Sequence, residues 1–225
     1  MRPLRELLSD DPAWPYVQEW IADATKPVEV LPASEPDRSI ALETMQVTTR
    51  SPMGAVVYET GGIVVDGGWL RILGSGHPRM PRSLPGGNKG RTWEEGQSAP
   101  PLLYVADDVV GGVFALDGGA LGGPPGHVHY FAPDRLEWES LERGYSDFLA
   151  WALQGDLGAF YESLRWPGWR DEVAKLSGDQ GISIYPFLWA AGPPVEDRAR
   201  KVAPIAEIVV MQFDVRRQMD DGNEA

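Results

Sequence analysis

Two histidines, His127 and His129, stand two residues apart in an apolar stretch of this 225-residue chain. Residues two apart in a β-strand point to the same face, so both imidazoles could ligate one metal ion. A third ligand would have to come from elsewhere, with Asp107 or Asp108 as candidates. No H-E-x-x-H motif is present, and paired histidines on a sheet more often pack or face solvent. We therefore predict no metal, no cofactor and no catalytic residue, and keep the two histidines as the alternative metal site.

Two pairs of adjacent acids, Glu94-Glu95 and Asp107-Asp108, invite comparison with enzymes that use two carboxyl groups. Such enzymes need both carboxyl groups to face one site, whereas neighbours in a strand point to opposite faces. We interpret Asp107-Asp108 as closing a connection between two strands, with side chains that bond turn amides. The sequence also lacks the motifs of nucleophilic catalysis, because it has no cysteine and no G-x-S-x-G sequence.

The glycine-rich stretches do not form a phosphate-binding loop. Gly74–Arg79 begins like a dinucleotide fingerprint, but Arg79 stands where the third glycine belongs, and nearby prolines disfavour the required helix. Gly86–Arg91 lacks the Gly-Lys-Ser/Thr ending. Residues 77–91 also carry four basic side chains and no acid. This basic segment could bind an anion or an acidic partner, but we favour a charged, solvated loop.

Aromatic residues point to a core with one exception. Most of the nine tryptophans should be buried in a core or an interface, because exposing an indole is costly. Trp93 lies beside two acids in a polar segment, where a core role is less natural, so we expect it at the surface. We predict a partner-binding surface formed by Trp93, Glu94, Glu95, Asp107 and Asp108.

The predicted elements are helices, then strands, then helices again. Apolar periodicity predicts helices within the first 45 residues, and short β-rich runs predict strands from residue 54 to 73 and from 102 to 131. One of these predicted strands covers residues 54–59. The glycine- and proline-rich residues 74–101 are expected to form a long surface loop, and 192–204 another. Helical patterns return after residue 145.

This order predicts an α+β fold with a mostly antiparallel (mixed) sheet flanked by N- and C-terminal helices. We expect one domain over residues 1–213 and a flexible tail over 214–225.

Composition limits the partners. The net charge is −13, and residues 101–225 hold 20 acids against 10 bases. Such a chain repels nucleic-acid phosphate and anionic lipid, so we expect no nucleic acid, no membrane, and a partner protein that is basic. The chain lacks a run of 18 apolar residues and a signal-peptide core, so we expect a cytoplasmic location. The absence of cysteine excludes disulfides and thiolate metal sites.

Several motifs resemble an uncharacterised bacterial family, the domain of unknown function numbered 2625. They extend over roughly residues 1–190 and are TTRSPMG (48–54), YETGG (58–62), GWLRILGSG (68–76), ADDVVGG (106–112) and LRWPGW (164–169). The family name implies no activity.

A wider resemblance, over about residues 50–155, is to the SUKH superfamily. It rests on the acidic turn at 107–108, the Asp117-Gly118-Gly119 turn, HVHYFAPD (127–134) and YSDFL (145–149). That resemblance implies an α+β binding module, which in bacteria is often an immunity protein that neutralises a toxin. The long segment 74–101 and the helical part after residue 156 depart from that pattern.

We therefore predict a non-enzymatic protein-binding module, immunity-like or regulatory, with the acidic and aromatic surface above as its binding face. The alternative is a small-molecule or metal-binding protein, or an enzyme, with a site around His127, His129 and Asp107 or Asp108. The oligomeric state is left open.

Overall fold

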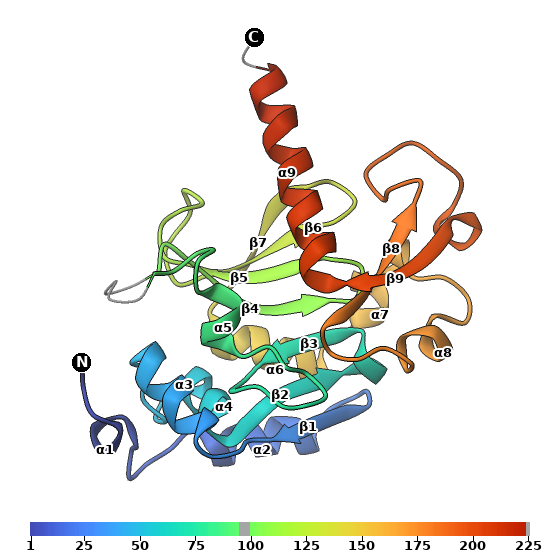
Figure 1. Ribbon diagram of the computed structural model, residues 1–225. Coiled ribbons are helices and arrows are strands. Elements are labelled where there is room, and N and C mark those ends of the chain that lie inside the picture. The colour runs from blue at the N-terminus through green and yellow to red at the C-terminus, as the bar shows by residue number, and fades with distance from the viewer. Residues whose placement is uncertain (95–99, 224–225) are drawn as a thin grey trace.

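A seven-stranded antiparallel sheet forms the centre of the structure (Figure 1). The computed structural model describes residues 1–94 and 100–223. Each strand pairs with the strand that precedes it in sequence, which confirms the α+β class with a mostly antiparallel sheet. The strands of this sheet are β1 (Val28–Pro32), β2 (Thr60–Val65), β3 (Leu70–Leu73), β4 (Leu102–Asp108), β5 (Val113–Asp117), β6 (Val128–Ala132) and β7 (Glu137–Arg143), and β8 (Gln180–Tyr185) and β9 (Ala199–Pro204) form a separate hairpin.

Helices precede, interrupt and follow the strands. They are α1 (Leu4–Leu7), α2 (Trp14–Ala22), α3 (Asp37–Met45), α4 (Pro52–Glu59), α5 (Leu84–Asn88), α6 (Tyr145–Gln154), α7 (Leu157–Phe160), α8 (Trp169–Val173) and α9 (Ile205–Asn223), with 3-10 turns η1 (Asp66–Gly68), η2 (Glu162–Leu164) and η3 (Val195–Asp197). Within the described ranges, none of these helices has the length and apolar character needed to cross a membrane.

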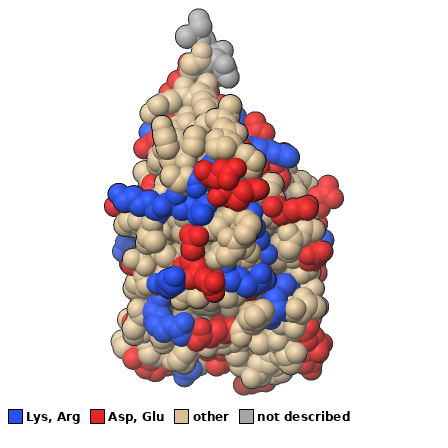
Figure 2. Space-filling model, turned by 90° about the vertical axis from the view of Figure 1, so that its right-hand side faces the viewer, with Lys and Arg blue, Asp and Glu red and all other residues tan. Residues whose placement is uncertain are grey.

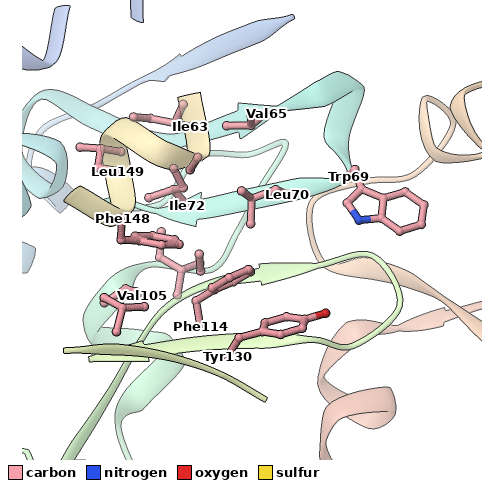
Figure 3. Close-up of a cluster of buried hydrophobic side chains, with 14 of the residues drawn as sticks. Ile63, Val65, Trp69, Leu70, Ile72, Val105, Phe114, Tyr130, Phe148 and Leu149 are labelled. Carbon is pink, nitrogen blue, oxygen red and sulfur yellow. The ribbon is translucent and has the colours of Figure 1, made fainter. Parts of the chain in front are cut away.

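One face of the sheet is covered by helices that come before most of the strands in sequence, such as α4, and by helices that follow them, such as α6. Alternate residues of β2 and β3, such as Ile63 and Ile72, are fully buried on this face. Figure 3 shows them beside Phe148 of α6, whose ring centroid lies 5.1 Å from that of Phe114. Burying each such side chain contributes about 1.5–3 kcal/mol. The larger of the two apolar clusters includes these residues.

The opposite face is covered by α9 and by the segment that contains α5. Val113 and Phe131 are opposite each other on β5 and β6, and both pack against the first turns of α9. Figure 1 shows α9 crossing this face and extending past the sheet. Over β2, Met80 occupies the space that a side chain at Gly62 would fill. Val113 and Phe131 thus belong to a second, smaller apolar cluster that packs against α9.

Residues 54–59, predicted as a strand, belong to helix α4, so that prediction was wrong. Ser51 caps the helix by accepting a hydrogen bond from the Gly54 amide at 3.1 Å, and Pro52 fits its first turn. Val56 and Val57 are completely buried, and tertiary packing overrides their preference for strands.

Residues 74–101, predicted as a surface loop, include buried positions and a short helix. Met80 and Leu84 are inaccessible to solvent. The side-chain Nδ2 of Asn88 donates to the backbone carbonyls of Leu84 and Tyr104, each at 2.8 Å. Its Oδ1 accepts from the Tyr104 N–H at 2.7 Å. Asn88 thus bonds the edge of β4 as a neighbouring strand would, and holds α5 against the sheet.

The predicted flexible tail is also helical where it is described, because residues 214–223 continue α9. Two ion pairs on this helix, Arg216–Asp220 at 3.0 Å and Arg217–Asp214 at 2.8 Å, have the spacing that supports helices.

Candidate functional site

Asp107 and Asp108, at the end of β4, point to opposite faces of the sheet. Asp107 faces the α9 side, where it is 6% exposed, and Asp108 faces the helix-covered side, where it is 0% exposed. Both carboxylates are therefore inside the protein. The prediction that these two acids are part of an exposed partner-binding surface was therefore wrong.

Asp107 neutralises two arginines. Arg71 is its cross-strand neighbour on β3, with Nε 3.0 Å from Oδ1, and Arg82 binds both carboxylate oxygens. Arg82 also donates to the Gly178 carbonyl at 2.6 and 3.0 Å, and Arg71 donates to the Gln180 carbonyl. The ion pairs thus join the sheet to two segments far away in sequence.

The second acid, Asp108, closes the β4–β5 turn. Its Oδ1 accepts from the amides of Val110 at 3.0 Å and Gly112 at 2.9 Å, and its Oδ2 accepts from the Tyr130 hydroxyl at 2.7 Å. Burial raises the pKa of the Asp108 carboxyl to about 6, although these three hydrogen bonds oppose the shift. We call Arg71, Arg82, Asp107 and Asp108 the charge network.

The two histidines do not share a metal site with these acids. His129 lies on β6 opposite Ala115, on the α9 side, whereas the Asp108 carboxylate is on the other side of the sheet. The His129 ring instead lies 3.4 Å from the carbonyl of His127. Across the described ranges, no group of three or more His, Cys, Asp or Glu side chains is placed to hold a metal ion.

The remaining predicted site residues are divided between core and surface. Trp93 is only 8% exposed, because the chain folds back from Asn88 and the Trp93 carbonyl accepts from the Gly90 amide at 3.0 Å. Its expected exposure was therefore wrong. Glu94 is exposed, and Glu95 lies outside the described residues. The four described residues do not form one exposed surface, because Trp93, Asp107 and Asp108 are buried.

A different acidic surface lies at the N-terminus. The segment 6–25 contains five acids and no Lys or Arg, and all five are exposed. In the part of the chain that the structure describes, none of them makes an ion pair with a basic side chain. Tyr16 is 58% and Leu8 38% exposed in the same segment. We call these seven residues the acidic surface: Glu6, Leu8, Asp10, Asp11, Tyr16, Glu19 and Asp23.

Thr49 holds the acidic surface in place. This buried residue donates its amide to the Leu7 carbonyl at 2.9 Å, accepts from the Ser9 amide at 2.8 Å through Oγ1, and accepts from the Ala13 amide at 2.8 Å. On α2, Val17 is buried while Tyr16 and Glu19 face solvent, as does Asp23, which follows the last residue of the helix. The carboxylates are thus carried by a fixed backbone.

On the side that carries α8 and the β8–β9 hairpin, charges are compensated. Figure 2 shows acidic and basic side chains next to one another there. Asp66 pairs with Arg165 at 2.7 Å and with Arg170 at 3.3 Å, and Glu172 pairs with Arg200 at 3.4 Å. The sequence analysis missed the acidic surface because it compared the net charges of the two halves of the chain. Within the shorter segment 6–25, the sequence holds five acids and no Lys or Arg.

The comparisons with known proteins identify relatives without an assigned role. Over residues 4–208 the chain matches the model of a family described as a protein of unknown function, DUF2625. An uncharacterised protein of Escherichia coli strain K12, YbfG, is 50% identical over 217 residues, which cover 96% of this chain and 98% of that protein. An uncharacterised protein of Haemophilus influenzae strain Rd is 44% identical over 189 residues, covering 84% and 83% respectively. The SUKH resemblance stays a prediction.

Proposed function

Because the chain belongs to DUF2625, a family of unknown function, we propose its role from geometry: it is a protein-binding module whose acidic surface binds a basic partner protein. The observation that carries this proposal is the set of five exposed carboxylates that make no ion pair with a basic side chain in the described chain. Unpaired like charges cost stability through repulsion, and a basic partner would remove that cost.

The exposed Tyr16 and Leu8 give the acidic surface an apolar component. Tyrosine is enriched among the residues that dominate binding energy, because it combines a large apolar area with a polar tip. The three hydrogen bonds to Thr49 fix the backbone between α1 and α2, which lowers the entropic cost of binding. Charge would attract the partner, and the two apolar side chains would provide contact area.

The alternative, a metal or small-molecule site around His127, His129 and Asp107 or Asp108, has less support. The two acids have their own hydrogen-bond and ion-pair partners, and they lie on opposite faces of the sheet. An immunity-like or regulatory role, as the SUKH resemblance implies, would follow if the basic partner were a toxin domain.

Crosslinking tests the location of binding. A photoreactive phenylalanine analogue placed at Tyr16 should crosslink the partner in lysate from cells that make the protein. The matched control is the same analogue at Tyr185, which is 65% exposed at the end of β8. A specific adduct from position 16 alone supports the proposal, whereas equal adducts at both positions, or none at 16, contradict it.

Charge variants test the chemistry of the partner. Replacing Asp10, Glu19 and Asp23 by their amides should weaken capture of the crosslinked partner about tenfold at low salt, since three exposed charge contacts contribute about 0.5 kcal/mol each. The control changes the net charge equally at acids that already have ion pairs, namely E137Q, E139Q and D214N. An equal loss in both variants would show a general charge effect and contradict the proposal.

A further inference from the structure

A hollow of about 440 Å³ lies next to the charge network and away from the acidic surface. It opens between β1, β2, the η1 turn and the segment that follows α8. Its size is within the range of small-molecule sites, about 300–1,000 Å³. Its walls are largely apolar and include Val28, Leu31, Val64, Val173 and Leu176.

The charged lining residues of this hollow are mainly basic. Arg71 is 2% exposed, and burial lowers the pKa of its guanidinium while Asp107 opposes the shift. Its Nη1 donates to the Gln180 carbonyl and its Nη2 to the Asp108 carbonyl at 3.1 Å. Each terminal nitrogen carries two N–H groups, so one on each has no acceptor among the described residues.

A second arginine stands at the rim. Arg79 pairs with Glu29 across the opening, with Nη2 2.9 Å from Oε2, and both side chains are about half exposed or more. Exposed pairs of this kind contribute little to stability, so a ligand carboxylate could replace Glu29 at little cost.

Arg79 is the lining arginine whose counter-charge can be exchanged. Arg71, Arg79 and Arg82 are balanced by the carboxylates of Glu29, Asp107 and Asp108, in a protein that is strongly acidic as a whole. A singly charged anion that takes the place of Glu29 keeps Arg79 ion-paired, and guanidinium binds carboxylates in a planar, bidentate manner.

From these observations we propose that the hollow binds a monocarboxylate with an apolar tail. The carboxylate pairs with Arg79 and with the free donors of Arg71, and the tail packs against the valine and leucine side chains. This site is independent of the acidic surface, since no residue of the segment 6–25 lines it.

Calorimetric titration of the full-length protein with octanoate tests the ligand class. Octanoate should bind saturably at one site with a Kd below about 1 mM. Octan-1-ol, which keeps the tail, and acetate, which keeps the carboxylate, should each bind at least about tenfold more weakly, because each loses one set of contacts. Absence of saturable octanoate binding, or equal binding of octan-1-ol, would overturn the proposal.

Two pairs of variants locate the site. V64E adds a negative charge in the hollow and should abolish octanoate binding, while V64Q, of the same shape, should retain most of it. R79Q should weaken binding about tenfold, whereas R135Q, which removes an exposed arginine from another ion pair, should not. Thermal melting of each variant verifies folding. Equal binding by V64E and V64Q, or by R79Q and R135Q, would place octanoate elsewhere and contradict the proposal.

Discussion

The charge network and the acidic surface use the same residue type in opposite ways. In the network, Asp107 is almost fully buried and pairs with two arginines, so its charge joins segments of the fold. On the acidic surface, five carboxylates are exposed and make no ion pair with a basic side chain in the described chain. Exposed groups that contribute little to the fold can change without loss of structure, and they are the ones available to a partner.

The largest expected effect comes from breaking the network. D107N removes the only carboxylate paired with Arg71 in the described structure and leaves a buried guanidinium without its counter-charge. Breaking one side of a buried pair costs about 3–5 kcal/mol, so the unfolding midpoint in urea should fall strongly.

The control for this variant is E137Q, which breaks an exposed pair with Arg216 and should change the free energy of unfolding by less than about 0.5 kcal/mol. Equal midpoints for D107N and E137Q would show that burial does not distinguish the two regions.

A pH-dependent effect is expected from the neighbouring acid. The folded-state pKa of Asp108, about 6, is above the ordinary carboxyl value of 3.8. The folded protein therefore takes up this proton more readily than the unfolded chain, and the resulting stability is present at low pH and lost as pH rises through 6. D108N cannot titrate, so wild type should gain about 2 kcal/mol over D108N between about pH 7 and pH 4.

Urea unfolding of both proteins across this pH range measures the difference, in which the contributions of other carboxylates cancel. A difference that does not change with pH would show that Asp108 titrates normally in the folded protein.

The smallest effect should come from the acidic surface. The double variant E19Q/D23N removes two like charges from α2, so the free energy of unfolding should change by less than about 0.5 kcal/mol, in the stabilising direction. Added salt should narrow the gap between this variant and wild type, because salt screens repulsion between exposed charges. A loss above 1 kcal/mol in thermal or urea unfolding would mean that these acids support the fold.

The sequence predicted the fold better than the site. Short β-rich runs separated by turn residues predicted an antiparallel sheet, because the short connections between such runs leave no room for crossover helices. The hairpin β8–β9 was missed, because Ala199–Pro204 has a basic, solvent-exposed pattern without a strong β signal.

For the site, strand alternation separated Asp107 from Asp108 correctly, but the burial of Asp107 depends on Arg71 and Arg82, which are 36 and 25 residues away from it in sequence. Trp93 illustrates the same limit, because local polarity does not show that the chain folds back.

The strand order has a consequence for how the chain is made. Every strand from β2 to β7 pairs with the strand synthesised just before it, so a nascent chain can extend the sheet one strand at a time as it leaves the ribosome. The apolar residues Val113 and Phe131 are different, because the helix that covers them, α9, is synthesised after all seven strands of the sheet. Until α9 has left the ribosome, that face is open to chaperones and to other nascent chains, and a message truncated before residue 205 would produce a protein prone to aggregation.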